Sequence, residues 1–345
     1  MSKKEYKRRR RLLNIIAAQM RRSLRQRAFI ASFQPLPRDV VILQSPAFFS
    51  IVRHEHRSNV LRFIGDIEAN FLAGRRLFLD FSRTWRLYSD GTLLLYATMY
   101  KLLNGTPTDQ ISCSYPRVHV VEQVLQHIGF FRLLRKPERA KVTHRSVKNW
   151  RVATGLDVDG EQFLPIQRQY SGEISSALLE SPLWPGVSEA MTNSLHHAYG
   201  SKNDEKRWWM FSQLSGRTLM LAFCDLGVGI PATMGHTKKY SLEAITEFIF
   251  RLRLLVTDGS LILAAFQLGI SQTKEAHRGK GLVQLMQVIG DKANGMLVVL
   301  SGCGMYRYAP SRHEKVISRN YSDKVPGTMI FWEIPIDGAD DGKGD

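Results

Sequence analysis

The sequence has few cysteines, no long apolar run and too few acidic residues to balance its basic ones. Its three cysteines, Cys113, Cys224 and Cys303, lie far apart, and their spacing suits neither a zinc site nor a disulfide framework. The longest apolar stretches, such as 261–270, reach only about half of the ~20 residues that a helix needs to cross a bilayer. We therefore expect reduced thiols and no transmembrane span.

The chain has 345 residues, which is more than one hydrophobic core usually organises, so we expect two domains. Its content of 44% hydrophobic residues is high enough for a folded body and excludes a largely disordered chain. The formal net charge is +17, but residues 1–27 contain eleven basic residues and one acidic residue. Most of the excess charge therefore belongs to a tail and does not describe the whole protein.

This tail, residues 1–34, has the pattern of a basic amphipathic helix. The apolar residues on one face of it are Leu13, Ile16, Ala17, Met20 and Leu24. A protein partner is one expected contact, and a nucleic acid or an anionic surface bound through residues 1–27 is the other; the sequence leaves both open. The apolar stretch 12–20 is interrupted by polar residues and followed by arginines without a cleavage site, so we expect a cytoplasmic protein.

Residues 35–135 alternate between strand and helix patterns, which predicts a small α/β layer domain. The expected strands are 40–43, 77–81 and 110–114, and the expected helices are 58–71, 92–103 and 118–128. The runs RRLFLDFSRTWRLYSDGTLLLYATMYKLL and ISCSYPRVHVVEQVLQHIGFFRLL resemble a divergent STAS domain, the fold of anti-sigma-factor antagonists. The family's phosphorylatable serine has its nearest counterpart in Ser89, which is alternatively a helix cap.

Residues 136–170 are rich in charge and turn formers without a sustained period, and we interpret them as a linker. The segment 171–336 is the expected second domain, and 337–345 is an acidic tail. Four sequence elements of this second domain carry its chemistry.

The first element is VSEAMTNSLHHAYG, whose apolar spacing predicts a helix. Glu189, Asn193 and His197 are spaced four residues apart and therefore share one helix face. A carboxylate and an amide oxygen one turn apart suit a hydrated Mg²⁺ and the water beside it, although an exposed polar face gives the same pattern.

The second element, LMLAFCDLGVGIPATM, is a strand that ends at Asp225 and continues into Gly227, Gly229 and Ile230. Alternate glycines permit the backbone to approach a flat ligand, and the aspartate is an acceptor for an exocyclic amine; a strand-to-loop turn is the simpler alternative. The third element, HRGKGLVQLMQVIG, places Gly279 and Gly281 before a helix, where backbone amides can hold phosphate. The fourth, GTMIFWEIPI, opens a buried strand with a glycine and a threonine.

In this order the four elements resemble the N, G1, G2 and G3 boxes of the GHKL ATPase superfamily, and EAMTNSLHHAYG is most similar to the anti-sigma-factor serine kinases. The resemblance implies an ATP-binding α/β sandwich with a Mg²⁺ cofactor. It implies that Asn193 coordinates the metal, that Glu189 is a general base, and that Asp225 binds the adenine amine. The remaining residues implied to bind the nucleotide are His197, Gly227, Gly229, Ile230, Arg278, Gly279, Lys280, Gly281, Leu282 and Thr328.

Residues 231–278 are longer than the corresponding segment of the compact anti-sigma kinases, with helical patterns at 241–255 and 260–268, and we expect an ATP lid there. Arg278 is either a γ-phosphate contact or a surface charge of this lid. The expected function is a nucleotide-driven switch: a Mg²⁺-dependent ATPase or serine/threonine kinase, with a protein partner at the STAS-like domain or the lid. A homodimer is a further expectation.

Two other functions stay open. One is a non-catalytic ATP-binding module that engages nucleic acid or protein through its basic tail. The other is a sensor histidine kinase, because RHEHRSNVLRFIGDIE places His54 in a loose phosphoacceptor pattern. The second is disfavoured because this segment leads directly into an expected strand and no second helix follows to complete a hairpin.

Overall fold

The computed structural model describes residues 39–104, 109–158, 160–164, 168, 183–199, 205–234, 242–272, 281–290 and 294–336. The chain divides into two units, Met1–Val41 and Ile42–Asp345. In the first unit only residues 39–41 are described, so the predicted basic helix and the acidic tail 337–345 lie outside the described residues. The described residues from Ile42 onward belong to one compact unit, and this unit contains the candidate site.

The first part of this unit is a layer of strands and helices in which all six predicted elements are present. They are β1 (Val40–Gln44), α2 (His54–Leu72), β3 (Arg76–Asp80), α3 (Ser89–Leu103), β5 (Ile111–Cys113) and α4 (His119–His127). The strands form a sheet in the order β1-β3-β5, in which β3 and β5 run parallel. Short elements join them: β2 (Phe48–Phe49), η2 (Phe81–Arg83), β4 (Arg86–Leu87) and α5 (Phe130–Leu133).

A cluster of aromatic rings forms the core of this N-terminal layer. Phe81 lies edge-on to Phe63 at 6.2 Å and to Phe130 at 5.6 Å between ring centroids. Phe49 packs against Phe63 in the same way. Such edge-to-face pairs bury large apolar areas and add specific geometry. The packing joins α2 to the segment that follows β3 and to α5.

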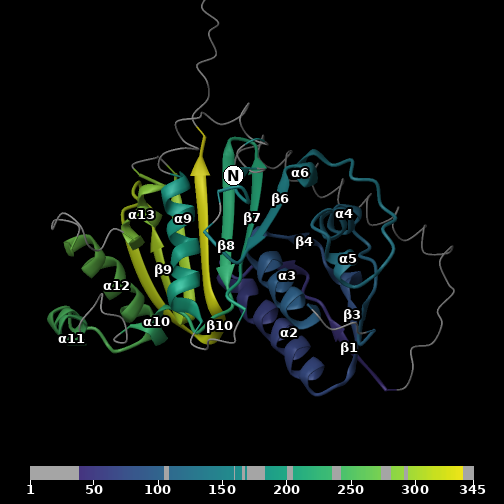
Figure 1. Ribbon diagram of the computed structural model, residues 1–345, viewed down its shortest axis with the longest axis horizontal. Coiled ribbons are helices and arrows are strands. Elements are labelled where there is room, and N and C mark those ends of the chain that lie inside the picture. The colour runs from purple at the N-terminus through teal and green to yellow at the C-terminus, as the bar shows by residue number, and fades with distance from the viewer. Residues whose placement is uncertain are drawn as a thin grey trace, which may run out of the picture. The chain divides into compact units, whose positions relative to one another are not determined.

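The second part is a five-stranded antiparallel sheet in the order β6-β7-β8-β10-β9 (Figure 1). Its strands are β6 (Trp150–Gly155), β7 (Trp208–Ser215), β8 (Thr218–Asp225), β9 (Met296–Tyr308) and β10 (Val316–Pro335). Its helices are α9 (Trp184–Asn193), the π-helical turn η4 (Ser194–Ala198), α10 (Ile230–Thr233), α11 (Leu242–Arg251), α12 (Asp258–Gln272) and α13 (Gly281–Gln287).

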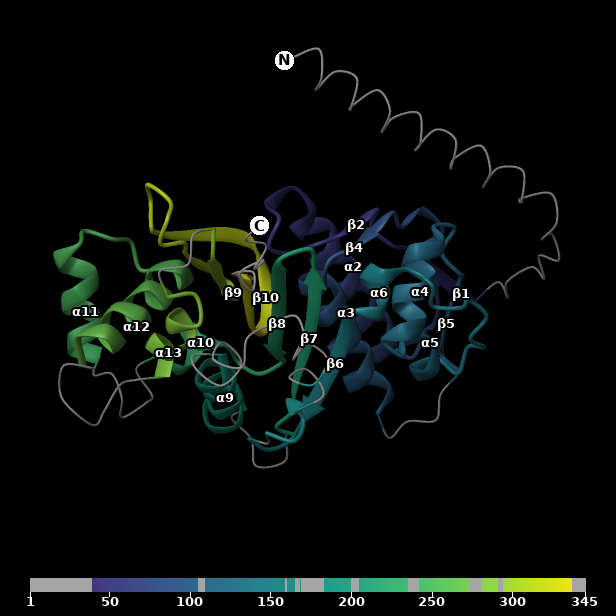
Figure 2. The ribbon, with the colours of Figure 1, turned by 90° about the horizontal axis from the view of Figure 1, so that it is seen from above.

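Helices cover both faces of this sheet (Figure 2). The helices α9, α12 and α13 lie on one face, and α2 and α3 lie on the other. Strand β8 is buried on both sides: Phe223 belongs to the core under α9 and α13, whereas Ala222 faces the opposite way and is equally buried. A strand covered on both faces has a nearly continuous apolar sequence, which explains the run in β8.

The predicted linker 136–170 contains a strand of the sheet, so that interpretation was incomplete. Within it lie α6 (Arg145–Lys148) and β6, which pairs with β7. Trp150 of β6 is buried and packs against Phe211 at 5.9 Å between ring centroids. Charged neighbours and a length of six residues concealed this edge strand, because its pattern is too short to form a sustained period.

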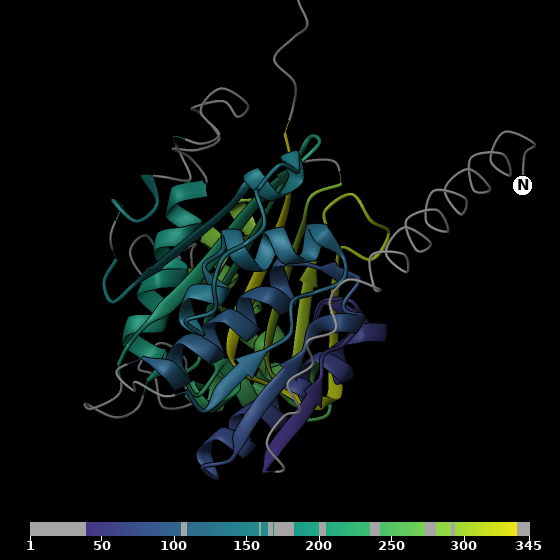
Figure 3. The same cartoon turned by 90° about the vertical axis from the view of Figure 1, so that its right-hand side faces the viewer.

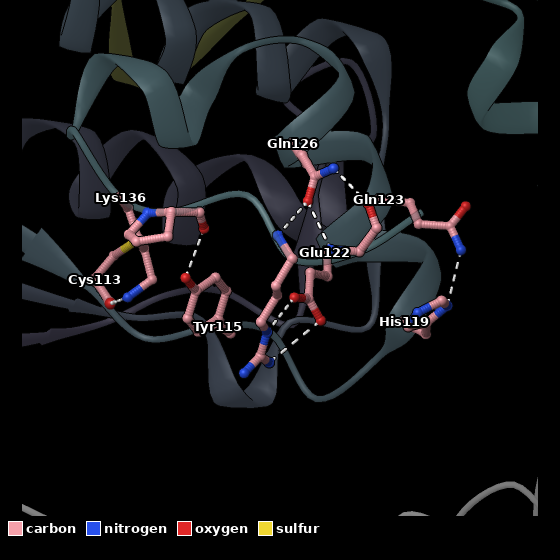
Figure 4. A network of polar contacts seen from close by, with 10 residues as sticks. Cys113, Tyr115, His119, Glu122, Gln123, Gln126 and Lys136 are labelled. Atoms are coloured by element: carbon pink, nitrogen blue, oxygen red, sulfur yellow. Dashed lines mark hydrogen bonds and ion pairs between the residues drawn. The ribbon is translucent and has the colours of Figure 1, made fainter. Parts of the chain in front are cut away.

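The beginning of the same segment is tied to α4 by side chains (Figure 4). The Gln126 side-chain oxygen accepts hydrogen bonds from the backbone N–H groups of Arg139, at 3.1 Å, and Ala140, at 2.9 Å. The Arg139 guanidinium donates to Glu122 at 2.6 Å and lies over the Tyr115 ring. These contacts satisfy backbone groups outside regular structure, which orders the chain before it enters β6.

The first half of β10 contacts helix α2 (Figure 3). The Arg57 guanidinium lies 3.8 Å from the centroid of the Tyr321 ring, and Ser58 donates a hydrogen bond to Asp323. Arg57 is 2% exposed, its Nε donates to the carbonyl of Ile51, and its Nη2 has no hydrogen-bond partner. Burial lowers the pKa of Arg57, against the raising effect of Tyr321 and Asp323.

The architecture is therefore mixed α/β, with parallel and antiparallel sheets. In the described part of the chain, no helix has both the length and the apolar character of a membrane span.

Candidate functional site

A cavity lies beside the sheet on the face covered by α9 and α13, with about 710 Å³ of space between atoms, its open mouth included. Segments far apart in the sequence form its walls: the end of α9 with η4, the end of β8, the start of α10, helices α12 and α13, and β10. Six sequence-predicted residues line it, namely Asn193, Asp225, Gly229, Ile230, Leu282 and Thr328. Its mixture of apolar walls with few polar groups is typical of small-molecule sites.

Helix α9 positions the predicted catalytic and metal-binding pair. The side-chain amide of Asn193 donates to the Glu189 carboxylate at 2.9 Å, and both side chains are partly exposed. Their spacing of four residues makes them neighbours on the helix surface, as predicted. Because this bond engages the amide nitrogen, the amide oxygen of Asn193 is the atom of that group suited to a metal ion.

The predicted helix does not stay α-helical to residue 199. After Asn193 the chain continues as η4, which changes the angular spacing along the helix. Its last residue, Ala198, accepts a hydrogen bond from the backbone N–H of Val228 at 2.7 Å. The turn is thus bonded to the loop after β8 rather than only to itself. Residue His197 belongs to η4, but its side chain lies outside the described atoms.

Asp225 is a buried carboxylate at the end of β8, with 5% of its surface exposed. Its Oδ1 accepts hydrogen bonds from the backbone N–H of Gly227 at 2.9 Å and of Thr328 at 3.3 Å. Its Oδ2 accepts from the Ser194 hydroxyl at 3.3 Å. Burial raises the pKa of Asp225 to about 6, against the lowering effect of these three donors. The carboxylate is thus held in place while it lines the cavity.

The glycines after Asp225 permit close contacts inside the protein. A Cβ atom at Gly227 would lie 2.0 Å from the carbonyl oxygen of Ala198. Gly229 has φ +87°, which side chains disfavour, and a Cβ there would lie 2.6 Å from the Ser301 hydroxyl. Gly229 lines the cavity, but Gly227 faces η4 and is not among the lining residues. Backbone packing therefore explains Gly227 without a ligand.

Ser301 is a site residue that the sequence analysis missed. This fully buried serine accepts a hydrogen bond from the backbone N–H of Ile230 at 2.9 Å and donates to the carbonyl of Gly327 at 2.9 Å. In the sheet, Thr328 of β10 is paired with Asp225 on one side and Ser301 on the other. Ser301 therefore joins the loop after β8 to the glycine-threonine pair. In the sequence, Ser301 is marked only by its position before Gly302 in a strand pattern.

The predicted phosphate-binding segment is described in part. Arg278, Gly279 and Lys280 lie outside the described residues, so their contacts stay predictions. Gly281 is the first residue of α13, and Leu282 lines the cavity with Leu285. The helix packs closely on α9, since a Cβ at Gly186 would lie 2.2 Å from a Val288 methyl carbon. The described start of α13 is thus adjacent to the cavity.

The structure also describes His54 and Ser89, the two residues that the sequence suggested as alternative phosphorylation sites. His54 is the first residue of α2, which leads directly into β3, and its ring centroid lies 6.1 Å from that of Tyr321. Ser89 is the first residue of α3, and Tyr88 occupies the N-cap position, so the helix-cap interpretation of Ser89 was wrong. The Ser89 side chain is buried, with 1% of its surface exposed.

No protein-family model matches this chain, and a comparison with curated proteins gives no match.

Proposed function

We propose that the chain is an ATP-binding protein of the GHKL type, a Mg²⁺-dependent ATPase or serine/threonine kinase that acts as a nucleotide-driven switch. One observation carries the proposal: a single cavity is lined by Asn193, Asp225, Leu282 and Thr328, one from each of the four predicted boxes. These residues are separated by up to 135 positions, and a chance resemblance of short motifs would not bring them to one cavity.

The cavity suits a purine base at Asp225. Apolar side chains of Ile230, Met234 and Ile330 line it around this carboxylate. A flat base can pack between such walls while its exocyclic amine donates to the aspartate, and a buried acceptor rejects ligands that lack a donor. Ser194, whose hydroxyl donates to the carboxylate, and Thr328, whose hydroxyl contacts Ser301, also line the cavity and add polar groups.

In the proposal, Mg²⁺ and the phosphates bind at the open side of the site. The described residues contain no group of three or more His, Cys, Asp or Glu side chains that could hold a metal ion. In the proposal, Asn193 holds Mg²⁺ through its amide oxygen, together with water and phosphate oxygens. The metal ion supplies charge neutralisation at the phosphates. Glu189 accepts a hydrogen bond from Asn193. In the proposal its carboxylate takes a proton from a water or a serine hydroxyl.

The proposed switch needs a surface that reads the nucleotide state, and the α11–α12 segment is the proposed ATP lid. Phe250 of α11 is 84% exposed, and Leu255 and Val256 in the α11–α12 connection are 82% and 77% exposed. Large apolar side chains gathered on a surface favour contact with another protein. We place the protein partner at this lid or at the layer that resembles a STAS domain.

The test measures nucleotide binding and the fate of the γ-phosphate together, in the full chain with ATP and Mg²⁺. We expect Glu189→Ala to bind ATP but lose turnover, and Asn193→Ala to lose Mg²⁺-dependent binding. Glu68→Ala on α2, outside the cavity, is the control and keeps both properties. Absence of ATP binding in the wild-type protein would refute the proposal.

The same assay separates the alternatives. Wild-type binding without hydrolysis or transfer would favour a non-catalytic module. Binding of DNA or RNA that weakens with salt and disappears on deletion of residues 1–27 would assign the basic tail to nucleic acid. An acid-labile phosphate on His54 after incubation with ATP would favour a histidine kinase.

A further inference from the structure

A second cavity opens on the opposite face of the five-stranded sheet, between the sheet and the N-terminal layer. It contains about 1390 Å³ of space between atoms, its mouth included. Its walls come from the loop before α2, from β4 and the start of α3, from α4 and from strands of the sheet. It shares no lining residue with the cavity around Asp225.

Three arginines from three separate segments line this second cavity. Arg53 precedes α2, Arg86 belongs to β4, and Arg312 lies in the β9–β10 connection. Among the described residues, none of these three guanidiniums forms an ion pair with a carboxylate. Arginine presents a planar set of donors that matches carboxylate and phosphate groups. The cavity therefore offers anion-binding donors that the protein does not pair internally.

An aromatic ring holds two of these cations near each other. The guanidinium carbons of Arg53 and Arg86 lie 5.0 Å and 4.9 Å from the centroid of the Tyr88 ring. The ring face attracts both cations, although like charges repel. The contacts with Tyr88 restrain both arginine side chains, so part of the cost of ordering them is met before an anion arrives.

The two carboxylates of the cavity do not cancel this charge. Asp90 is buried, and its Oδ2 already accepts from the Ser50 hydroxyl and from the backbone N–H groups of Ile51 and Val52, at 2.7, 2.7 and 2.8 Å. Glu333 of β10 is partly buried, which raises its pKa, as does Asp90, while Arg53 and Arg312 lower it. Three guanidiniums thus face two carboxylates, one of them already engaged by three donors.

The rest of the cavity suits an apolar body. Its lining includes the rings of Trp85, Trp150 and Phe331, and α4 adds Val121 and Val124. Helix α3 begins at the cavity with Ser89, so the positive end of its dipole adds to the charge of the arginines. An apolar wall opposite a group of cations is complementary to a ligand with an aromatic part and an anionic part.

We propose that this cavity binds a small organic anion, in which an aromatic body carries a carboxylate or phosphate group held by Arg53, Arg86 and Arg312. This site is independent of the proposed nucleotide site. It would let the protein sense a second small molecule through the same central sheet.

Calorimetric titration of the full chain with phenyl phosphate, benzoate, inorganic phosphate and the neutral benzyl alcohol tests the proposal. We expect saturable binding of at least one aromatic anion, with weaker binding of inorganic phosphate and none of benzyl alcohol. The stronger of phenyl phosphate and benzoate identifies the anionic group. Absence of binding by both at millimolar concentration, or equal binding of benzyl alcohol, would overturn the proposal.

Variants locate the binding. Arg86→Gln with Arg312→Gln should weaken binding of the aromatic anion at least tenfold, because both side chains are exposed and their removal leaves the core intact. Arg76→Gln on β3 removes an exposed arginine outside the cavity and should change nothing. Equal affinity in the double variant and the control would contradict the assignment.

Glu333→Gln provides a test of opposite sign. Removal of this negative charge removes its repulsion of the bound anion, so we expect binding of the aromatic anion to tighten several-fold. Weaker binding in Glu333→Gln, with the fold intact by circular dichroism, would contradict the proposed placement of the anion.

Discussion

The two faces of the five-stranded sheet carry cavities of opposite character. On the α9 face, one buried carboxylate, Asp225, lies among apolar walls and is fixed by backbone donors. On the α3 face, three exposed arginines surround a larger opening. A buried charge with fixed partners favours selection of one ligand shape, whereas exposed cations on flexible side chains favour a class of anions. The two proposed sites of the same sheet would therefore differ in selectivity.

The largest expected effect is on the free energy of unfolding, at the close backbone contact on the α9 face. Gly227→Ala places a Cβ against the backbone of Ala198, which cannot move away easily, and we expect a loss of about 4 kcal/mol in the free energy of unfolding. Gly65→Ala in α2 is the matched control, because nothing lies within 4 Å of its new Cβ. Its stability should rise by about 0.5–1 kcal/mol. Urea unfolding of both variants measures the difference, and equal stabilities would contradict this packing.

The second effect is the pH dependence caused by Asp225. Burial raises its pKa to about 6 in the folded protein, and the unfolded value is about 3.9, so the folded state binds the proton more tightly. The free energy of unfolding should therefore fall as pH rises from about 4 to 6, by about 3 kcal/mol relative to Asp225→Asn. Parallel urea titrations of the two proteins between pH 4 and 7 check the sign. A difference that is constant with pH would show that this carboxylate titrates normally.

The third effect tests whether the cavities are independent. Asp225→Asn should weaken ATP binding ten- to hundred-fold, or about 1.5–3 kcal/mol, by replacing a charged acceptor. It should leave the binding of phenyl phosphate or benzoate unchanged. Arg86→Gln with Arg312→Gln should do the reverse. If either variant lost binding of both ligands, the two cavities would not be independent binding sites.

The smallest effect concerns Ser301. Ser301→Ala removes the acceptor of the Ile230 backbone N–H, so we expect a loss of about 1 kcal/mol in stability and weaker ATP binding. Ser215→Ala at the exposed end of β7 should change stability by less than about 0.5 kcal/mol. Thermal unfolding with and without ATP separates the two contributions. An unaltered ATP-dependent shift would limit Ser301 to a structural role.

Sequence patterns predicted the long elements α2, α3 and β8 well, because their buried positions are occupied by apolar residues and leave a visible pattern in the sequence. They did not reveal β6, whose six residues lie among charged neighbours. Asn193 and Asp225 were predicted through residue types tied to a chemical task, and both line the same cavity. Ser301 was missed because its role depends on strand register, which brings it opposite Thr328. The role of Gly227 likewise depends on η4, a departure from α-helical geometry that no local pattern signalled.

The contact of Arg57 with β10 bears on how the protein unfolds. The guanidinium is buried by Tyr321, a residue more than 260 positions away in the chain. If α2 separated from this strand, the Tyr321 ring and the bond between Ser58 and Asp323 would be lost together. The two predicted domains should accordingly melt in one cooperative transition. A fragment cut between them would expose apolar surface on both pieces, so the boundary suggested by the sequence is a poor place to divide this protein.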